Sequence, residues 1–334
     1  MAAIFPLPRA DLAIDFGTAN LRVIRRDSGV VFDQPSLCCF ARTPTSRDVF
    51  AIGLEAKAMV DRTPPHLDVK RPLIRGVLQD IETARALLDH AMKRALGTRR
   101  LRSPAVMMGV PADATLAERD ALIAVARDVG LRRVRLVPEP LAAAAGAELP
   151  YDRPGGTMIV ECGAGTTEVA VLSLSGLCLS RSVRTGGAAL DQAIADHLHA
   201  QHKFLVGEQT AERIKLEHVA RRDDAAAGGA TVLAKGLSLT SRRPATIEVA
   251  LAELDEVVDR HATLIVTAVL DALNATPPEL SQDIHDRGIV LTGGAATSWI
   301  RRRVSEASGV RVSIAEAPLH CVARGLQHLL CAAA

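Results

Sequence analysis

Residues 13–20 read AIDFGTAN, and residues 159–168 in the other half of the chain read IVECGAGTTE. Each stretch places an acidic residue, a glycine and a threonine at a bend between two short apolar runs, so each predicts a strand–turn–strand hairpin. Glycine lets backbone N–H groups approach an anion, and the threonine hydroxyl adds a donor. Either turn alone is also typical of an ordinary tight turn. Two of them, one in each half, indicate two similar domains that hold one metal-bound phosphate.

The length and composition of the chain suit two globular domains. It has 334 residues, of which 48% are hydrophobic and only 2% aromatic, so the core must be aliphatic. A formal net charge of +2 gives no field that would attract nucleic acid, and we expect no nucleic-acid partner. The six cysteines lack CxxC spacing, which favours buried, reduced thiols of a cytosolic protein. The sequence predicts neither a signal peptide nor a transmembrane span.

The two halves repeat one order of predicted elements. A meander of short strands over residues 10–40 is matched by three strands over residues 157–183, and each is followed by helices that alternate with strands. Each half also carries an insert, at residues 41–75 and 204–250. The repeat lies in the order of elements rather than in the residues, and it predicts an α/β protein built by internal duplication.

Two further motifs could contribute to a nucleotide site. Residues 290–296 read VLTGGAA, in which a glycine pair leaves backbone free to lie against an α-phosphate, a ribose or a base. A plain strand-to-helix turn is equally compatible with this pattern. Glu139 stands between two prolines at a predicted helix start. There it could orient or deprotonate a water that attacks a γ-phosphate, or simply favour the positive end of the helix dipole.

A charged helix around residues 208–215 is the last candidate. Glu212 and Lys215 are three residues apart and share a helix face, which fits contacts to a ribose and a base. A solvated helix with an ion pair on its surface would have the same spacing. The ten histidines show no metal-binding spacing such as HExxH, so no other metal site is predicted.

Several longer runs resemble the bacterial actin homologue MreB, a family within the actin, hexokinase and Hsp70 superfamily. The most specific are TPPEL at residues 276–280 and DRGIVLTGG at residues 286–294, which favour MreB over Hsp70-type chaperones and sugar kinases. The resemblance extends from about residue 10 to residue 330. The other runs that carry it lie at residues 11–20, 51–57, 71–77, 165–171 and 207–212.

The resemblance implies an actin-like ATPase fold, in which two duplicated ribonuclease-H-like domains enclose a nucleotide cleft. Domain I would comprise residues 1–145 and 316–334, with a small insert at about residues 33–75. Domain II would comprise residues 146–315, with a small insert at about residues 185–245.

The resemblance also implies a function. The family binds ATP with Mg²⁺ and polymerises into antiparallel double filaments on the inner face of the cytoplasmic membrane, where the filaments guide the cell-wall elongation machinery and maintain rod shape. We therefore expect a cytoplasmic protein that is peripheral at that membrane and associates with copies of itself. Residues 97–103, read GTRRLRS, would attract anionic lipid through their arginines.

The motifs assign roles to residues of this chain. The resemblance implies that Glu139, helped by Thr167, positions the attacking water, and that Asp15 and Glu161 hold Mg²⁺ through water. The residues that would line the nucleotide are Asp15, Gly17, Thr18, Ala19, Asn20, Gly163, Ala164, Gly165, Thr166, Glu212, Lys215, Gly293, Gly294, Ala295 and Ala296.

Four departures from the family pattern lie near the expected ligand. Glu161 stands where the family has Asp, Ala164 and Ala295 stand where it has Gly, and residues 186–189 read GGAA where it has GGDK. These changes indicate a divergent paralogue that binds nucleotide and hydrolyses it slowly. A nucleotide-binding scaffold without turnover is the main alternative, and a small-molecule kinase of the same superfamily is a further one.

Overall fold

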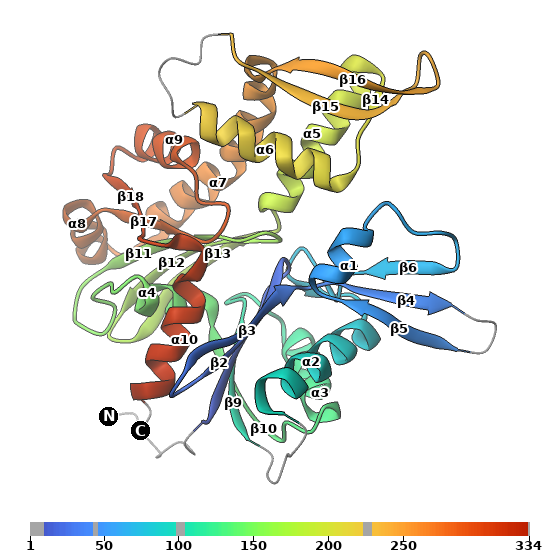
Figure 1. Ribbon diagram of the computed structural model, residues 1–334. Coiled ribbons are helices and arrows are strands. Elements are labelled where there is room, and N and C mark those ends of the chain that lie inside the picture. The colour runs from blue at the N-terminus through green and yellow to red at the C-terminus, as the bar shows by residue number, and fades with distance from the viewer. Residues whose placement is uncertain (1–9, 43–45, 98–103, 223–228, 333–334) are drawn as a thin grey trace.

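The computed structural model describes residues 10–42, 46–97, 104–222 and 229–332 of the chain (Figure 1). Two five-stranded sheets lie at its centre. Sheet I contains, in spatial order, β10 (Arg133–Pro138), β9 (Ala105–Val110), β1 (Leu12–Phe16), β2 (Asn20–Arg25) and β3 (Gly29–Pro35). Sheet II contains β13 (Gly176–Val183), β12 (Thr167–Ser173), β11 (Thr157–Cys162), β17 (Ile289–Thr292) and β18 (Val312–Ile314).

The two sheets have the same topology. In sheet I, β1, β2 and β3 form an antiparallel meander, and β1 continues into a parallel array with β9 and β10. In sheet II, β11, β12 and β13 form the corresponding meander, and β11 continues into a parallel array with β17 and β18. The predicted α/β architecture and its internal duplication are therefore confirmed.

Helices cover both faces of sheet I, as the side-chain alternation of a strand requires. On β1, Ile14 packs in the cluster that includes α2 and α3, whereas its neighbour Ala13 packs with α4 and α10 on the opposite face. The bounds of these helices are α2 (Ile81–Leu96), α3 (Leu116–Asp128), α4 (Glu139–Gly146) and α10 (Cys321–Ala332).

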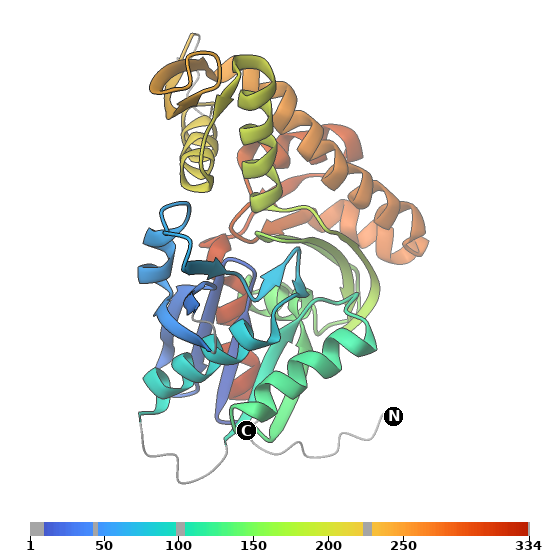
Figure 2. The same ribbon diagram turned by 90° about the vertical axis from the view of Figure 1, so that its right-hand side faces the viewer.

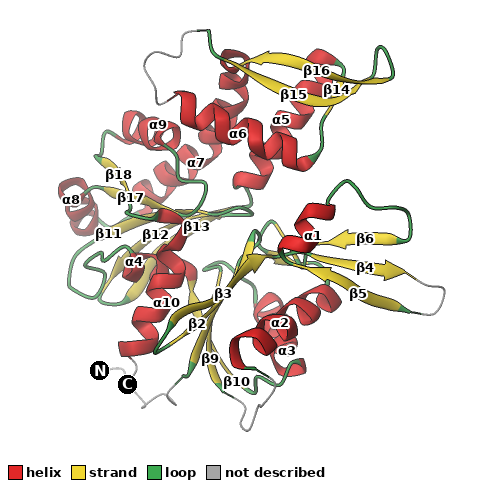
Figure 3. Ribbon diagram, viewed as in Figure 1, coloured by secondary structure: helices red, strands yellow, loops and turns green. Residues whose placement is uncertain are grey.

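Sheet II is covered in the same way, and it shares one layer with sheet I. Val160 of β11 packs with the helices on the outer face, whereas Ile159 packs with alanines of α4. Helices α4 and α10 therefore lie between the two sheets, as Figure 3 shows. The outer helices are α7 (Asp255–Ala275), α8 (Pro278–Arg287) and α9 (Ser298–Ser308), and short 3-10 turns occur at Leu251–Leu254 and Pro318–His320.

Each half carries an insert, and the two inserts face one another in both views (Figures 1 and 2). The first insert comprises β4 (Cys38–Arg42), β5 (Arg47–Ile52), α1 (Leu54–Met59), β6 (Leu67–Lys70), β7 (Leu73–Ile74) and β8 (Val77–Leu78). The second insert comprises α5 (Gly187–His202), β14 (Phe204–Leu205), α6 (Glu208–Arg222), β15 (Thr231–Ser238) and β16 (Arg243–Ala250). The expected domain boundaries fall in the last turn of α4 and directly after β18, and they stay a prediction.

Local sequence explains where several helices begin. The side chain of Asp80 accepts a hydrogen bond from the Thr83 N–H and caps α2. Thr115 and Glu118 form a reciprocal capping box at the start of α3, which satisfies two N–H groups that the helix itself leaves unpaired. Helix α4 begins directly after Pro138, with Glu139 as its first residue. Local sequence therefore sets where these helices begin, and Glu139 takes the first position of α4.

Two expectations need correction or lie outside the described residues. Four cysteines are buried, but Cys178, on the edge strand β13, and Cys331, in the last turn of α10, are exposed because neither position faces a core. All six are free thiols.

The helices in the described part of the chain include none with the length and apolar character needed to cross a membrane. Residues 98–103 of the expected lipid contact are outside that part.

Candidate functional site

The two acidic-glycine turns have the same geometry. In the turn between β1 and β2, the Gly17 N–H donates to the carbonyl oxygen of Asn20 at 3.0 Å, and in the turn between β11 and β12, the Gly163 N–H donates to that of Thr166 at 2.9 Å. A Cβ on either glycine would lie within about 3.1 Å of the same carbonyl oxygen. Both hairpins are confirmed, and at each glycine a side chain would crowd the carbonyl oxygen that the glycine N–H contacts.

The tips of the two turns meet. The Thr18 hydroxyl of the first turn accepts a hydrogen bond from the Gly76 N–H of the first insert at 3.3 Å. A Cβ on Gly165 of the second turn would collide with the Thr18 hydroxyl and would lie 2.8 Å from the Gly76 nitrogen. Thr18, Gly76 and Gly165 therefore bring both halves of the chain and the first insert to one point.

The third glycine motif lies against the second turn. The Ala295 N–H donates to the Cys162 carbonyl oxygen at 2.9 Å, and a Cβ on Gly293, which has a φ of +90°, would lie 2.8 Å from a carboxylate oxygen of Glu161. Gly293 is thus required by both its conformation and its surroundings. Gly294, next to it, is exposed, and Ala296 continues the turn through its N–H to the Gly293 carbonyl oxygen.

Helix α5 also starts on the second turn. The N–H groups of Gly187 and Ala188 donate to the carbonyl oxygens of Gly163 and Ala164, at 3.0 and 2.9 Å. A Cβ on Gly187 would lie 3.4 Å from the Lys215 amine and 3.6 Å from the Ala295 methyl group. The structure therefore brings Lys215 to the second and third motifs, where its charge is balanced by Asp191 at 2.8 Å.

Glu212 lies elsewhere, because its side chain pairs with the first insert. Its carboxylate is 3.1 Å from the Lys57 amine of α1. Three more polar contacts accompany this pair: the Glu208 N–H donates to Asp61 at 2.9 Å, Gln209 donates to the Lys57 carbonyl oxygen at 2.6 Å, and Arg71 pairs with Glu208. We call these four contacts the insert bridge. It joins α6 to the first insert across the two halves of the chain.

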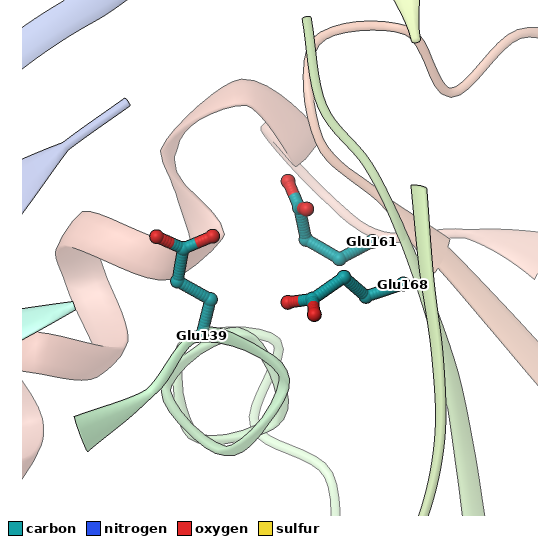
Figure 4. Close-up of side chains that lie close together, drawn as sticks. All are labelled: Glu139, Glu161 and Glu168. Atoms are coloured by element: carbon teal, nitrogen blue, oxygen red, sulfur yellow. The ribbon is translucent and has the colours of Figure 1, made fainter. Parts of the chain in front are cut away.

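Three carboxylates gather beneath the meeting turns. Glu139, at the start of α4, lies near Glu161 of β11 and Glu168 of β12, and Figure 4 shows their three carboxyl groups in one region, with that of Glu168 extending toward Glu139. One oxygen of each lies within 4.8 Å of the others. Glu161 and Glu168 are directly opposite one another in the hairpin register and are buried. The charges converge because α4 packs on this face of sheet II.

The environment of this cluster resists ionisation. Burial is the main cause that raises the pKa of each carboxyl group, and the neighbouring carboxylates raise the pKa of Glu139 and Glu161 further. For Glu168 the pKa rises to about 8. One Glu168 oxygen accepts a hydrogen bond from the Ala112 N–H at 2.8 Å, whereas the other is buried without a partner. Such a donor-poor set of carboxylate oxygens fits a hard divalent cation.

Glu168 was missed as a candidate although it ends the quoted turn motif. The signal was available, because a hairpin that turns at residues 163–166 places residue 168 opposite residue 161. Thr167 was expected beside Glu139, but successive residues of a strand point to opposite faces. Its buried hydroxyl donates to the Thr185 carbonyl oxygen at 2.8 Å. The structure therefore does not bring that hydroxyl toward the carboxylate cluster, and its role in hydrolysis stays a prediction.

The Asp15 carboxylate forms a buried ion pair with the guanidinium group of Arg22. Arg22, its cross-strand partner, donates to the Asp15 carboxylate at 2.9 Å and to Asp33 at 3.0 Å, and both Arg22 and Asp15 have side chains only 8% exposed. Burial raises the pKa of Asp15, and Arg22 opposes that rise. Asn20 also donates to Asp33, at 2.6 Å. Sequence reasoning missed Arg22, whose charge competes with the expected contact between Asp15 and a metal.

The duplicated sheets with facing phosphate-type turns define the actin-like class of two-domain folds. The MreB/Mbl protein family matches residues 9–333. The chain is 40% identical over 321 residues to the cell shape-determining protein MreB of Escherichia coli (strain K12). The aligned region covers 94% of this chain and 91% of that relative. The chain is also 35% identical over 316 residues to the cell shape-determining protein Mbl of Bacillus subtilis (strain 168), with 94% of each covered. The chain belongs to the MreB/Mbl family.

Solved structures agree with this assignment. MreB5 of Spiroplasma citri bound to ADP superposes with a TM-score of 0.88 at 28% identity, covering 95% of each chain. The same protein bound to AMPPNP gives the same values. A MamK double helical filament, 21% identical, has a TM-score of 0.75 over 95% of this chain and 97% of its own, and it supports the fold alone. The predicted actin-like fold is confirmed.

Proposed function

We propose that the chain is an ATP-binding, filament-forming cytoskeletal protein that serves cell shape. The observation that carries this function is the meeting of the two turns: Thr18 and Gly165 place the two expected phosphate loops at one point, with the Gly293 turn beside them. The names of the relatives, cell shape-determining MreB and Mbl, support the role. The nucleotides bound to MreB5 support ATP as the ligand.

The residues of the site suggest how ATP would be handled. The backbone N–H groups around residues 17–20 and 163–166 would bind the phosphates, and Lys215 would add a positive charge at the edge of the second turn. Mg²⁺, when bound, would neutralise phosphate charge. Glu139 would orient the attacking water, since it begins α4 and its carboxylate lies within 4.8 Å of that of Glu161, next to the second turn.

Sedimentation with and without nucleotide tests this function. We expect the protein to pellet in ATP or AMPPNP with Mg²⁺ and to stay in the supernatant without nucleotide, and to release phosphate in ATP. Glu139→Gln should keep pelleting and lose at least tenfold in phosphate release. Glu148→Gln is the matched control, because the Glu148 side chain is 79% exposed. Failure of the wild type to bind ATP would contradict the proposal.

A scaffold that binds ATP without turnover is the second candidate, and one observation favours it. Arg22 already neutralises Asp15, one of the two residues expected to hold Mg²⁺. ATP-dependent pelleting without phosphate release would support this candidate over the ATPase.

Location at the inner membrane surface, antiparallel double filaments and contact with the cell-wall elongation machinery are further parts of the proposal. They follow from the family. Flotation with vesicles of anionic lipid, compared with neutral vesicles, tests the membrane part: only the anionic vesicles should carry the protein upward. Electron microscopy of the filaments tests whether the two strands are antiparallel.

A further inference from the structure

Helix α6 begins at a residue that cannot cap it. Gly207 occupies the cap position, because its carbonyl oxygen accepts the N–H groups of Thr210 and Ala211, both at 3.1 Å. A serine, threonine, aspartate or asparagine at such a position would pair with an N–H group that the first turn leaves free, whereas glycine has no side chain to do so. An acceptor for the first turn of α6 must therefore come from another segment.

The first insert supplies this acceptor. The carboxylate of Asp61, in the segment after α1, accepts the Glu208 N–H of α6 at 2.9 Å. Asp61 has a φ of +60°, in the left-handed region that aspartate tolerates better than most residues. A Cβ on Gly207 would lie 2.8 Å from the same carboxylate oxygen, which is closer than van der Waals contact allows. A side-chain cap at residue 207 and the cap from Asp61 thus exclude one another in this arrangement.

The capping is reciprocal. The Gln209 side chain of α6 donates at 2.6 Å to the Lys57 carbonyl oxygen, which belongs to the last turn of α1. The carbonyl end of α1 therefore meets the N–H end of α6, and the partial charges of the two ends are opposite in sign. The hydrogen bond between Asp61 and Glu208 is exposed to solvent, so water can replace either partner when the inserts separate. The contact is therefore suited to open and close.

The same helix reaches the expected nucleotide site. Lys215, about two turns after Glu208, donates to the Gly187 carbonyl oxygen at 3.2 Å beside the second turn. We propose that Asp61 is a positioning residue for the nucleotide: by capping α6 from the opposite half of the chain, it holds the two inserts together and slows release of the nucleotide. The inference rests on the proposed function and adds a control of release to it. Each opening of the inserts leaves the start of α6 without its cap.

The release rate of a fluorescent ADP tests this role. Asp61→Gly suits the φ of +60° and removes the cap, so release should become roughly fivefold faster or more. Asp61→Asn keeps an acceptor oxygen and tolerates the same backbone conformation, so its release rate should stay within about twofold of that of the wild type. Glu55→Gln, which changes an exposed carboxylate of α1, is the control and should release ADP as the wild type does.

A double variant separates this role from the stability of α6 alone. In Asp61→Gly, the further change Gly207→Ser gives α6 a cap of its own, because the carboxylate that would crowd the new side chain is gone. Release should stay fast, since the new cap does not join the inserts. Slow release in the double variant would overturn the proposal, because Asp61 would then act only by stabilising the helix.

Hydrogen exchange on nucleotide-free protein gives a second measurement. Amides of residues 208–211 should exchange faster in Asp61→Gly than in the wild type, and the change should be absent in Glu55→Gln. Equal ADP release from Asp61→Gly and the wild type would contradict the role of Asp61 and leave the proposed function intact. Failure of the wild type to bind ADP at all would instead contradict the proposed function, so the two failures are distinguishable.

Discussion

Replacing Gly325 by alanine should disturb both the stability of the protein and the position of Glu139. Gly325 of α10 and Gly146 of α4 mark the closest approach of the two helices between the sheets. A Cβ on Gly325 would lie 2.8 Å from the Gly146 nitrogen and would collide with the Ala142 carbonyl oxygen. The backbone of a helix cannot turn aside as a flexible side chain can.

The size of the effect follows from that overlap. The two helices would have to separate by roughly 1.5 Å before a methyl group clears the carbonyl oxygen. Overpacking of this kind costs about 3 kcal/mol, at the upper end of its usual range, because the contact is with backbone. The higher helix propensity of alanine relative to glycine offsets about 1 kcal/mol of this cost. We therefore expect Gly325→Ala to lower the free energy of unfolding by about 2 kcal/mol.

Urea denaturation followed by circular dichroism measures this loss. Gly176→Ala is the control, since its Cβ would meet only the Ser173 carbonyl oxygen at an ordinary 3.5 Å. Glu139 begins α4, so Gly325→Ala should also reduce phosphate release in ATP at temperatures where the variant is folded. A variant as stable as the control would refute the packing argument, because the helices would then have room that the structure does not give them.

Three further changes test other contacts. Arg22→Met leaves Asp15 buried without its cation, so it should lower the free energy of unfolding, measured by urea denaturation, by about 3–5 kcal/mol. Adding Asp15→Asn should recover most of that loss, and no recovery would contradict the pairing of Asp15 with Arg22. The raised pKa of Glu168, from 4.5 to about 8, means that the folded state keeps a proton that the unfolded state loses. In EDTA, the free energy of unfolding should therefore fall as the pH rises from 5 to 8, by on the order of 1 kcal/mol per pH unit at most. Glu168→Gln should make this dependence on pH weaker. A wild type whose free energy of unfolding rises over this window would contradict the raised pKa of Glu168. Lys57→Ala removes the partner of Glu212 in the insert bridge and should speed release of a fluorescent ADP roughly two- to fivefold, because one half-exposed ion pair stabilises by less than about 1 kcal/mol. An unchanged release rate would show that the bridge does not restrain the nucleotide.

The local features of the site were predictable from sequence because they depend on neighbouring residues. Glycine and apolar runs specify the two hairpins, and once a turn is placed at residues 17–20, the register alone sets Arg22 opposite Asp15. The same reasoning would have found Glu168. These pairings needed only the alternation of a strand and the position of a bend.

Contacts between distant segments could not be predicted in this way. Lys57 and Glu212 are 155 residues apart in the chain, and each also fits a solvated helix face, so nothing local indicates that they pair. The approach of Gly325 to Gly146 is equally hidden, because a glycine in a helix is otherwise only a weak helix former. Tertiary packing decides these positions.

A crystal structure of the protein with AMPPNP and Mg²⁺ would test the central claim most directly. The account predicts the phosphates between the turn at residues 17–20 and the turn at residues 163–166, with Gly293 beside the nucleotide. Nucleotide bound elsewhere on the molecule, or crystals grown at saturating AMPPNP without nucleotide between these turns, would contradict it.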